Sequence, residues 1–375
     1  MSFDPFEPID REVAALARDR LLRLPGVPGD LHVVCSNDYL GLGARPVTVT
    51  APGGATASPL VSGYTDVHAT AAECLAAWLR AESVTLFTSG YAANVGVLQA
   101  LGCERTVLLS DALNHASIID GCRLARARVE VVPHLDLSAL EGALRSVRST
   151  SAAARVWFVT ESYFSMDGDV PDLREIRALC DRYDAGLVVD EAHALGVYGA
   201  EGRGLCASVG VIPDVLVGTL GKSFGLHGAF AAGRETLRTL LWNRARSLVF
   251  STAPSPLVMS LVPGRVREVR EGDELRAQVA ERANQLRSAL MTLATRRSAG
   301  GSASAIGQGP ICPLVVGSVD RALSLAQELE AAGFLVKAMR PPTVPVHASR
   351  LRFTATLATP SEVAVRLCAF LAALP

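Results

Sequence analysis

The sequence predicts an α/β fold, in which a large domain with a mostly parallel sheet flanked by helices precedes a smaller C-terminal α/β domain. Three observations support this prediction. The chain of 375 residues is 49% hydrophobic, which is enough for a large core and too long for one compact unit. Helical stretches alternate with short strand-like runs between residues 69 and 219. These runs are almost entirely apolar, as is typical of strands buried in a parallel sheet.

The expected elements follow one another in a regular order. An amphipathic helix over 9–24 is stopped by Pro25-Gly-Val-Pro-Gly, and residues 44–59 are rich in turn formers, which predicts an irregular surface connection. Alternating helices and strands come next: helices over 69–80, 91–101, 137–148 and 173–183, and strands over 84–87, 107–109, 129–132, 156–159, 187–189 and 215–217. A mainly helical region over 255–298 leads to a final strand, helix and strand. We therefore expect an N-terminal helical segment over 1–35, a large domain over 36–260 and a small domain over 261–375.

The composition limits the possible functions. With 36 basic and 37 acidic residues and no long run of one sign, the chain offers no electrostatic surface for nucleic acid or an anionic membrane. No apolar run reaches the ~18 residues of a membrane span. The eight cysteines include no Cys-x-x-Cys pair, which argues against zinc and against disulfides. We expect a cytoplasmic protein with no metal and with small-molecule partners.

Two segments after expected strands could bind part of a ligand. Thr88-Ser-Gly-Tyr91 follows a strand and opens a helix, so its N–H groups could hold a phosphate, and a tight strand-to-helix turn is the alternative. His115 follows the next strand and could lie flat against an aromatic ring, although a structural role is the more common one for a single histidine.

Two later segments indicate a particular cofactor. Asp190 ends the apolar run Leu187-Val-Val, with His193 three residues later. A pyridoxal 5'-phosphate (PLP) ring needs such a carboxylate at its pyridine nitrogen, and a helix N-cap is the alternative for this aspartate. Lys222 lies between glycines after another apolar run, where a partly desolvated amine can act as a nucleophile. Only PLP binding accounts for the phosphate turn, the histidine, the aspartate and the lysine in this order.

Rival nucleotide-binding motifs are absent from the sequence. It has no Gly-x-Gly-x-x-Gly after a first strand and no Gly-x-x-x-x-Gly-Lys-Ser/Thr. The segments that contain Tyr91, His115, Asp190 and Lys222, by contrast, resemble those of the α-oxoamine synthases, a family of fold-type I PLP-dependent transferases. The resemblance extends over nearly the whole chain. The matching segments are 35–42, 60–68, 89–94, 114–121, 161–169, 190–193, 202–204, 219–222 and 250–252.

The resemblance implies a role for each matching residue. Lys222 binds PLP covalently and then takes the proton from the substrate α-carbon, Asp190 pairs with the pyridine nitrogen, and His193 lies near the ring hydroxyl. The implied catalytic residues are Lys222, His115, Asp190 and His193. The implied cofactor-binding residues are Gly90, Tyr91, His115, Ser165, Asp190, His193, Thr219, Lys222, Ser251 and Thr252, the last two reaching a partner subunit in a homodimer. The implied substrate-binding residues are Arg20, His115, Thr343 and Arg352, the last for the amino-acid carboxylate.

One segment distinguishes between members of this family. Arg340-Pro-Pro-Thr343-Val-Pro345, followed by Arg350-Leu-Arg352, resembles the branch that joins L-alanine to a pimeloyl thioester of CoA or acyl carrier protein in biotin biosynthesis. Glycine or serine with another acyl thioester, in specialised metabolism for example, is the alternative, and a non-catalytic homologue is a third. The short 44–59 connection, Pro59 and His227 depart from the family pattern near the expected substrate entrance and the lysine loop, so they bear on the acyl donor.

Overall fold

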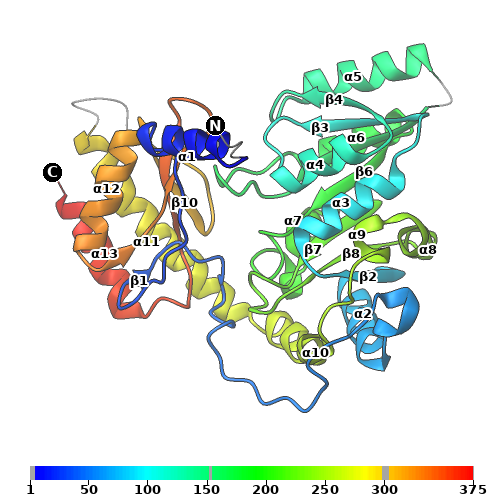
Figure 1. Ribbon diagram of the computed structural model, residues 1–375, viewed down its shortest axis with the longest axis horizontal. Coiled ribbons are helices and arrows are strands. Elements are labelled where there is room, and N and C mark those ends of the chain that lie inside the picture. Colours follow the sequence, from blue (N-terminus) through cyan, green and yellow to red (C-terminus); the bar gives the residue numbers. More distant parts are fainter. Residues whose placement is uncertain (1–4, 152–153, 298–303, 375) are drawn as a thin grey trace.

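The computed structural model describes residues 5–151, 154–297 and 304–374, and it has a larger and a smaller lobe (Figure 1). The larger lobe holds the middle of the chain, from the blue helix at residues 66–79 to the yellow-green helix at residues 256–270 (Figure 1). The smaller lobe combines both ends of the chain, because the blue N-terminal elements lie beside the orange and red C-terminal ones (Figure 1). The expected fold class, a mostly parallel sheet flanked by helices with a smaller C-terminal α/β unit, is confirmed.

In the described part of the chain, the larger lobe is built on a seven-stranded sheet of order β2-β8-β7-β6-β5-β3-β4. Its strands are β2 (Ser83–Phe87), β3 (Thr106–Asp111), β4 (Arg128–Val132), β5 (Arg155–Glu161), β6 (Gly186–Asp190), β7 (Val215–Thr219) and β8 (Ala229–Gly233). All of them point in one direction except β8, which is antiparallel to both of its neighbours. β2 and β3 are buried along their whole length, because helices cover both faces of the sheet.

Helices connect and cover these strands. They are α2 (Asp66–Leu79), α3 (Gly90–Leu101), α4 (Ala116–Leu124), α5 (Leu137–Thr150), α6 (Leu173–Arg182), α7 (Gly204–Val209), α8 (Glu235–Arg244), α9 (Arg246–Val249) and α10 (Pro256–Arg270), with the short helices η1 (Pro59–Gly63) and η2 (Ala200–Gly202). Several begin at a side-chain cap: Ser89, Asp136 and Asp172 each accept the N–H of the third helical residue. These caps explain where the three helices begin.

The smaller lobe has its own sheet and core. Among the described residues its strand order is β12-β13-β10-β9, and β1 pairs with β11 beside it. Its elements are α1 (Glu7–Arg18), β1 (His32–Val33), β9 (Ser304–Ala305), β10 (Ile311–Gly317), β11 (Phe334–Leu335), β12 (Ala338–Met339), β13 (Ser349–Thr354), α11 (Asp273–Arg297), α12 (Val319–Ala331) and α13 (Ser361–Ala373). Leu290, Leu314 and Leu351, from α11, β10 and β13, are fully buried at its centre.

Residues 34–43, which we call the N-terminal strap, join the two lobes. Val34 lies in the core of the smaller lobe and Leu42 in that of the larger. The strap also meets the chain that follows β13, since the N–H of Leu357 donates to the main-chain oxygen of Tyr39 at 2.9 Å. The expected domain limits at 35 and 260 stay predictions; the second lies within α10.

The leading helix ends earlier than the sequence predicts. α1 covers Glu7–Arg18 rather than 9–24. Arg20 has a φ of 57°, in the left-handed region, and the N–H of Leu21 donates to the main-chain oxygen of Leu16. This Schellman cap closes the helix, so the apolar residues beyond it do not continue the helical face.

Of the other expected elements, most are confirmed, and several elements of the structure were not predicted. The alternating strands and helices are confirmed to within a few residues, and no helix or strand occupies 44–58, as expected. β8 was not predicted, because its residues Ala229-Phe-Ala-Ala-Gly233 include no β-branched side chain. The helices α4, α7, α8, α9 and α13 and the short strands of the smaller lobe were not predicted either.

Candidate active site

The candidate site lies at the edge of the large sheet where the strands have their carboxyl ends. β3, β5, β6 and β7 end there at Asp111, Glu161, Asp190 and Thr219. β2 points the same way, so the N-terminus of α3 at Gly90 lies at this edge too. Ligands of open α/β sheets bind outside these strand ends.

Asp190 is buried and held by two donors. Its Oδ2 accepts the side-chain amide of Asn94 at 2.7 Å, and its Oδ1 accepts the N–H of Ala192 at 2.8 Å. Asn94 lies in α3 and also donates to the Ser117 hydroxyl at 2.9 Å. The carboxylate therefore has a fixed orientation, and the bond to Ala192 resembles a cap, which was the alternative role for this residue.

Lys222 lies in a tight turn after β7. Burial lowers the pKa of its amine, Arg352 adds to this, and the negative charges of Asp190 and Glu161 oppose it. The amine therefore lies among charged groups from both lobes. The turn packs directly on the N-terminal strap: Gly225 has a φ of 60°, and a Cβ there would lie 2.2 Å from the nitrogen of Gly43. Only glycine fits at position 225.

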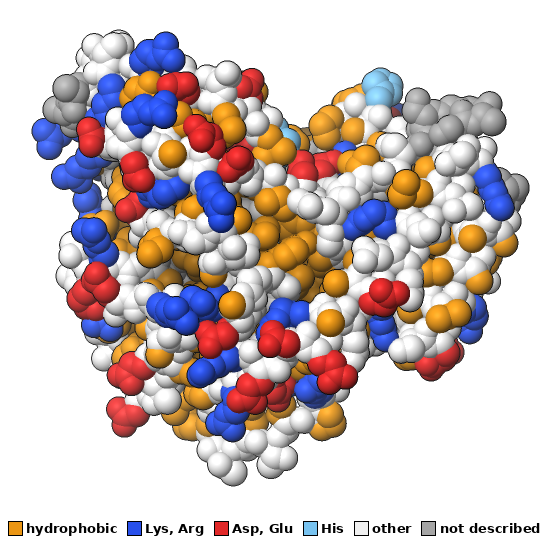
Figure 2. Space-filling model, turned by 180° about the vertical axis from the view of Figure 1, so that it is seen from behind, with side chains coloured by type: hydrophobic (Ala, Val, Ile, Leu, Met, Phe, Trp, Pro, Cys, Tyr) orange, Lys and Arg blue, Asp and Glu red, His pale blue; other side chains and the backbone are white. Residues whose placement is uncertain are grey.

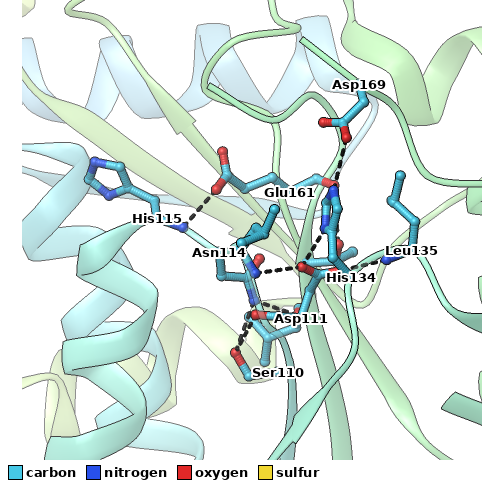
Figure 3. A network of polar contacts seen from close by, with 11 residues as sticks. Ser110, Asp111, Asn114, His115, His134, Leu135, Glu161 and Asp169 are labelled. Atoms are coloured by element: carbon cyan, nitrogen blue, oxygen red, sulfur yellow. Dashed lines mark hydrogen bonds and ion pairs between the residues drawn. The ribbon is translucent and has the colours of Figure 1, made fainter. Parts of the chain in front are cut away.

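His115 and Glu161 meet beside these groups (Figure 3). The N–H of His115 donates to Oε1 of Glu161 at 2.7 Å, and the ring Nδ1 of His115 pairs with the Ser117 hydroxyl at 2.7 Å. Burial and the nearby charge of Asp190 raise the pKa of Glu161, while burial lowers the pKa of His115. Glu161 belongs to a segment that carried the family resemblance, yet the sequence analysis gave it no role, because its burial next to Asp190 is not visible in the sequence.

His193 pairs with a residue that the sequence analysis did not single out. Its Nδ1 lies 2.6 Å from the hydroxyl of Tyr39 in the N-terminal strap, and both side chains are buried. Burial lowers the pKa of His193 well below its usual value and raises the pKa of Tyr39 to about 12, so both are neutral at pH 7. Only the fold brings residue 39 to residue 193.

Arg352 enters the site from β13 of the smaller lobe. It is 4% exposed, its Nε donates to the main-chain oxygen of Ser165, and its Nη1 donates to Oδ1 of Asn37 at 3.0 Å. Its Nη2 is buried, and no acceptor for it lies among the described residues. A buried guanidinium nitrogen without an acceptor suits a ligand carboxylate.

The residues expected at a phosphate are partly brought together. A Cβ on Gly90 would lie 3.9 Å from Cβ of Thr219, so these two positions adjoin. The Thr219 hydroxyl accepts the N–H of Gly221 at 3.1 Å. Tyr91 is half exposed and donates from its hydroxyl to Asp120 at 2.6 Å. Ser251 and Thr252 follow α9, and Thr252 is exposed.

Arg20 and Thr343 lie near each other in the smaller lobe, linked through Arg340. Nη1 of Arg20 forms an ion pair with Asp320 at 2.8 Å, and the guanidinium of Arg340 donates to the main-chain oxygen of Arg20. The N–H of exposed Thr343 donates to the main-chain oxygen of Arg340 at 3.1 Å. The roles of Arg20 and Thr343 stay predictions, as do those of the other site residues.

The described ranges contain neither a candidate metal site nor a candidate membrane span. No group of three or more His, Cys, Asp or Glu side chains there could hold a metal ion. No described helix is long and apolar enough to span a membrane.

Seen from behind, the molecule has a notch between its lobes, with hydrophobic side chains gathered below the notch and basic and acidic ones interspersed around it (Figure 2).

Comparisons with known proteins agree with this architecture, which is that of the fold-type I PLP-dependent transferases. A family model described as aminotransferase class I and II matches residues 30–371. A solved serine palmitoyltransferase from Sphingomonas wittichii has a TM-score of 0.86 at 26% identity and covers 98% of this chain and 96% of its own. An SPT structure containing PLP has a TM-score of 0.87 at 22% identity, with the same coverage, and shows the fold alone.

The sequence relatives are more specific. An 8-amino-7-oxononanoate synthase of Polaromonas naphthalenivorans is 41% identical over 341 residues, which are 87% of this chain and 82% of that protein. The chain belongs to the class I and II aminotransferase family and, within it, to the 8-amino-7-oxononanoate synthases. The family resemblance found in the sequence is thereby confirmed.

Proposed function

We propose that this protein condenses L-alanine with a pimeloyl thioester of CoA or acyl carrier protein, releasing 8-amino-7-oxononanoate, CO2 and the free thiol in biotin biosynthesis. It is then a PLP-dependent acyltransferase of the EC 2.3.1 class. The name of its relatives supports the product. The observation that carries the proposal is the half-buried Lys222, whose amine has Asp190, Glu161 and Arg352 as charged neighbours.

The residues present fit PLP. Because residue 90 is glycine, the space beside Thr219 is not filled by a side chain. The first N–H groups of α3 lie next to this space, where the phosphate of PLP would bind. Asp190 is a buried, oriented carboxylate suited to the pyridine nitrogen, and Lys222 offers the amine. PLP, when bound, supplies an electron sink for a carbanion at the substrate α-carbon. His115, His193, Ser165 and Tyr91 would complete the binding site.

The chain's own groups then handle the substrate. Arg352 would bind the carboxylate of alanine through Nη2, while Nε and Nη1 keep the guanidinium in place. Lys222 would take the α-proton, because its lowered pKa leaves a useful fraction of the amine neutral near pH 8. Neutral His193 and Tyr39 would hydrogen-bond the ring hydroxyl without adding charge.

We further propose a homodimer, in which Ser251 and Thr252 reach the phosphate region of the second copy. Thr252 is exposed, as a residue serving a neighbouring subunit must be before assembly. Arg20 and Thr343 would contact the acyl donor. A cytoplasmic location accords with small-molecule substrates.

Rates with alternative substrates test the proposed reaction. We expect kcat/KM to be highest for L-alanine with pimeloyl-CoA or pimeloyl-acyl carrier protein among combinations of alanine, glycine and serine with acetyl, succinyl, pimeloyl and palmitoyl thioesters. Release of free thiol and of CO2 in equal amounts would show the condensation. A higher value for glycine or serine, or for another acyl chain, would contradict the assignment and leave the family unchanged.

Replacing Arg352 by lysine should weaken amino-acid binding. Lysine keeps the positive charge but lacks the planar guanidinium. In the wild-type protein that group contacts Ser165 and Asn37 through Nε and Nη1 and still has Nη2 for a ligand. We expect KM for L-alanine to rise by about 10- to 100-fold, the equivalent of one or two charge-assisted hydrogen bonds. KM for the thioester should stay within about threefold. An unchanged KM for alanine would place the carboxylate elsewhere.

A further inference from the structure

His134 lies between two carboxylates next to the candidate site. It precedes α5, and its Nδ1 lies 2.7 Å from Oδ1 of Asp111 while its Nε2 lies 2.9 Å from Oδ2 of Asp169 (Figure 3). Its ring and that of Phe164 are nearly perpendicular, with ring centres 4.5 Å apart. We call Asp111, His134 and Asp169 the His134 bridge. None of these residues has a role in the proposed reaction.

The bridge holds a charged imidazole. Both ring nitrogens face carboxylate oxygens, so both contacts are hydrogen bonds only when both nitrogens carry a proton. Burial by itself would lower the pKa of His134, but the hydrogen bonds and charges of Asp111 and Asp169 outweigh it and raise the pKa to about 9. At pH 7 the bridge is therefore an imidazolium between two carboxylates.

One end of the bridge fixes the turn that leads to His115. Oδ1 of Asp111 also accepts the N–H of Leu113 at 2.8 Å, and its Oδ2 accepts the N–H of Leu135 at 3.2 Å. The same turn continues to His115, whose N–H donates to Glu161. A shift of Asp111 would therefore be passed on to His115.

The other end fixes the loop 164–169. This loop is closed on itself, since the N–H of Phe164 donates to the main-chain oxygen of Asp169 at 3.0 Å. Its opposite side receives the smaller lobe: the Ser165 oxygen accepts from Arg352, and Arg350 donates to Asp167. The loop is thus anchored by His134 on one side and positions Arg352 on the other.

We propose that His134 is a positioning residue for amino-acid binding: by bridging Asp111 and Asp169 it sets where the loop 164–169 holds Arg352 relative to His115. The inference rests on the proposed function, since it takes the Arg352 ligand to be the carboxylate of an α-amino acid. Nothing else described on the large-lobe side of this loop joins it to the His115 turn through charged groups.

His134→Gln tests the bridge. A glutamine amide can donate to one carboxylate, but its oxygen then faces the other, so the loop loses one anchor. We expect the dissociation constant and KM of L-alanine to rise by about 10- to 100-fold, because small displacements of a positioning group have effects of that size. The KM of the thioester should change by less than about threefold. In the unliganded protein, hydrogen exchange at the amides of 164–169 should become faster.

Asp169→Asn separates positioning from mere stability. Its oxygen still accepts from Nε2 of His134, while the loss of one negative charge lowers the pKa of the imidazole. The charged groups that face the ring are Asp111 from β3 and Asp169 from the loop, and Asp136 on the same segment is bound to the N–H of Ala139. Alanine affinity should be near normal at pH 6.5, where the imidazole is still charged. As the pH rises, the affinity should begin to fall at a lower pH than in the wild-type protein, because the imidazole of the variant loses its proton earlier.

Asp136→Ala is the matched control. It removes the N-cap of α5 two residues from His134 and leaves the bridge intact, so it should lower the melting temperature without changing alanine affinity. The inference is overturned if His134→Gln behaves like this control, in both alanine affinity and exchange at 164–169. Wild-type protein that binds no α-amino acid, although exchange responds as expected, would instead contradict the proposed function and with it the ligand named here.

Discussion

Replacing Lys222 by alanine should abolish turnover. We expect kcat to fall by about 10⁴-fold or more, because the variant loses both the amine that binds PLP and the group that moves the substrate proton. Reduction with borohydride in the presence of PLP should attach the cofactor to residue 222 of the wild-type protein, and peptide mass mapping would locate it. The same treatment should leave the variant unlabelled.

The chain provides a clean control for this experiment. It contains two lysines, Lys222 and Lys337, and Lys337 is exposed beside β12. Lys337→Ala should keep kcat within about twofold, as is usual for a surface substitution. Labelling of Lys337 in place of Lys222, or turnover by Lys222→Ala, would refute the assignment of the lysine.

Asp190→Asn should have the second largest effect. We expect kcat to fall by about 10³-fold, because a neutral amide cannot keep the pyridine nitrogen of PLP protonated and because fixed charges of this kind contribute about that much. The charge of Asp190 raises the pKa of both Lys222 and His115. Its removal should therefore also move the acidic limb of the pH–rate profile to lower pH.

The adjacent glutamate supplies the comparison for this variant. Glu191 is fully buried, and its carboxylate accepts the N–H groups of Leu205 and Cys206 at the start of α7. Glu191→Gln should lower the melting temperature and leave kcat within about tenfold, since it disturbs packing rather than the site. Equal losses in the two variants would mean that Asp190 acts only through stability.

Local sequence patterns predicted much of the fold. The run Leu187-Val-Val is apolar enough to indicate a buried strand, and Asp190 after it marks the strand end, so β6 and its aspartate were found together. β8 was missed because its alanines have no strand preference of their own and are strands only through their neighbours β2 and β7. α1 was extended too far because a left-handed arginine gives no local signal.

The candidate site was predictable only where its residues follow strands. His115, Asp190 and Lys222 do so, and the structure places them together. Tyr39 and Glu161 were assigned no role, because their chemistry depends on burial beside His193 and Asp190. His134 was missed for the same reason: nothing in the chain near residue 134 indicates that Asp169 will lie against it.

The N-terminal strap has a consequence for the order of folding. Residues 34–43 are synthesised early, but their hydrogen bonds to Thr354 and Leu357 require residues that follow more than 300 positions later. Contacts so distant in sequence are slow to form. During synthesis the large sheet can therefore assemble before the strap is fixed, and Tyr39 and Arg352 reach the candidate site last. A nascent chain stalled before β13 would contain Lys222 and Asp190 without a complete binding site for the amino acid.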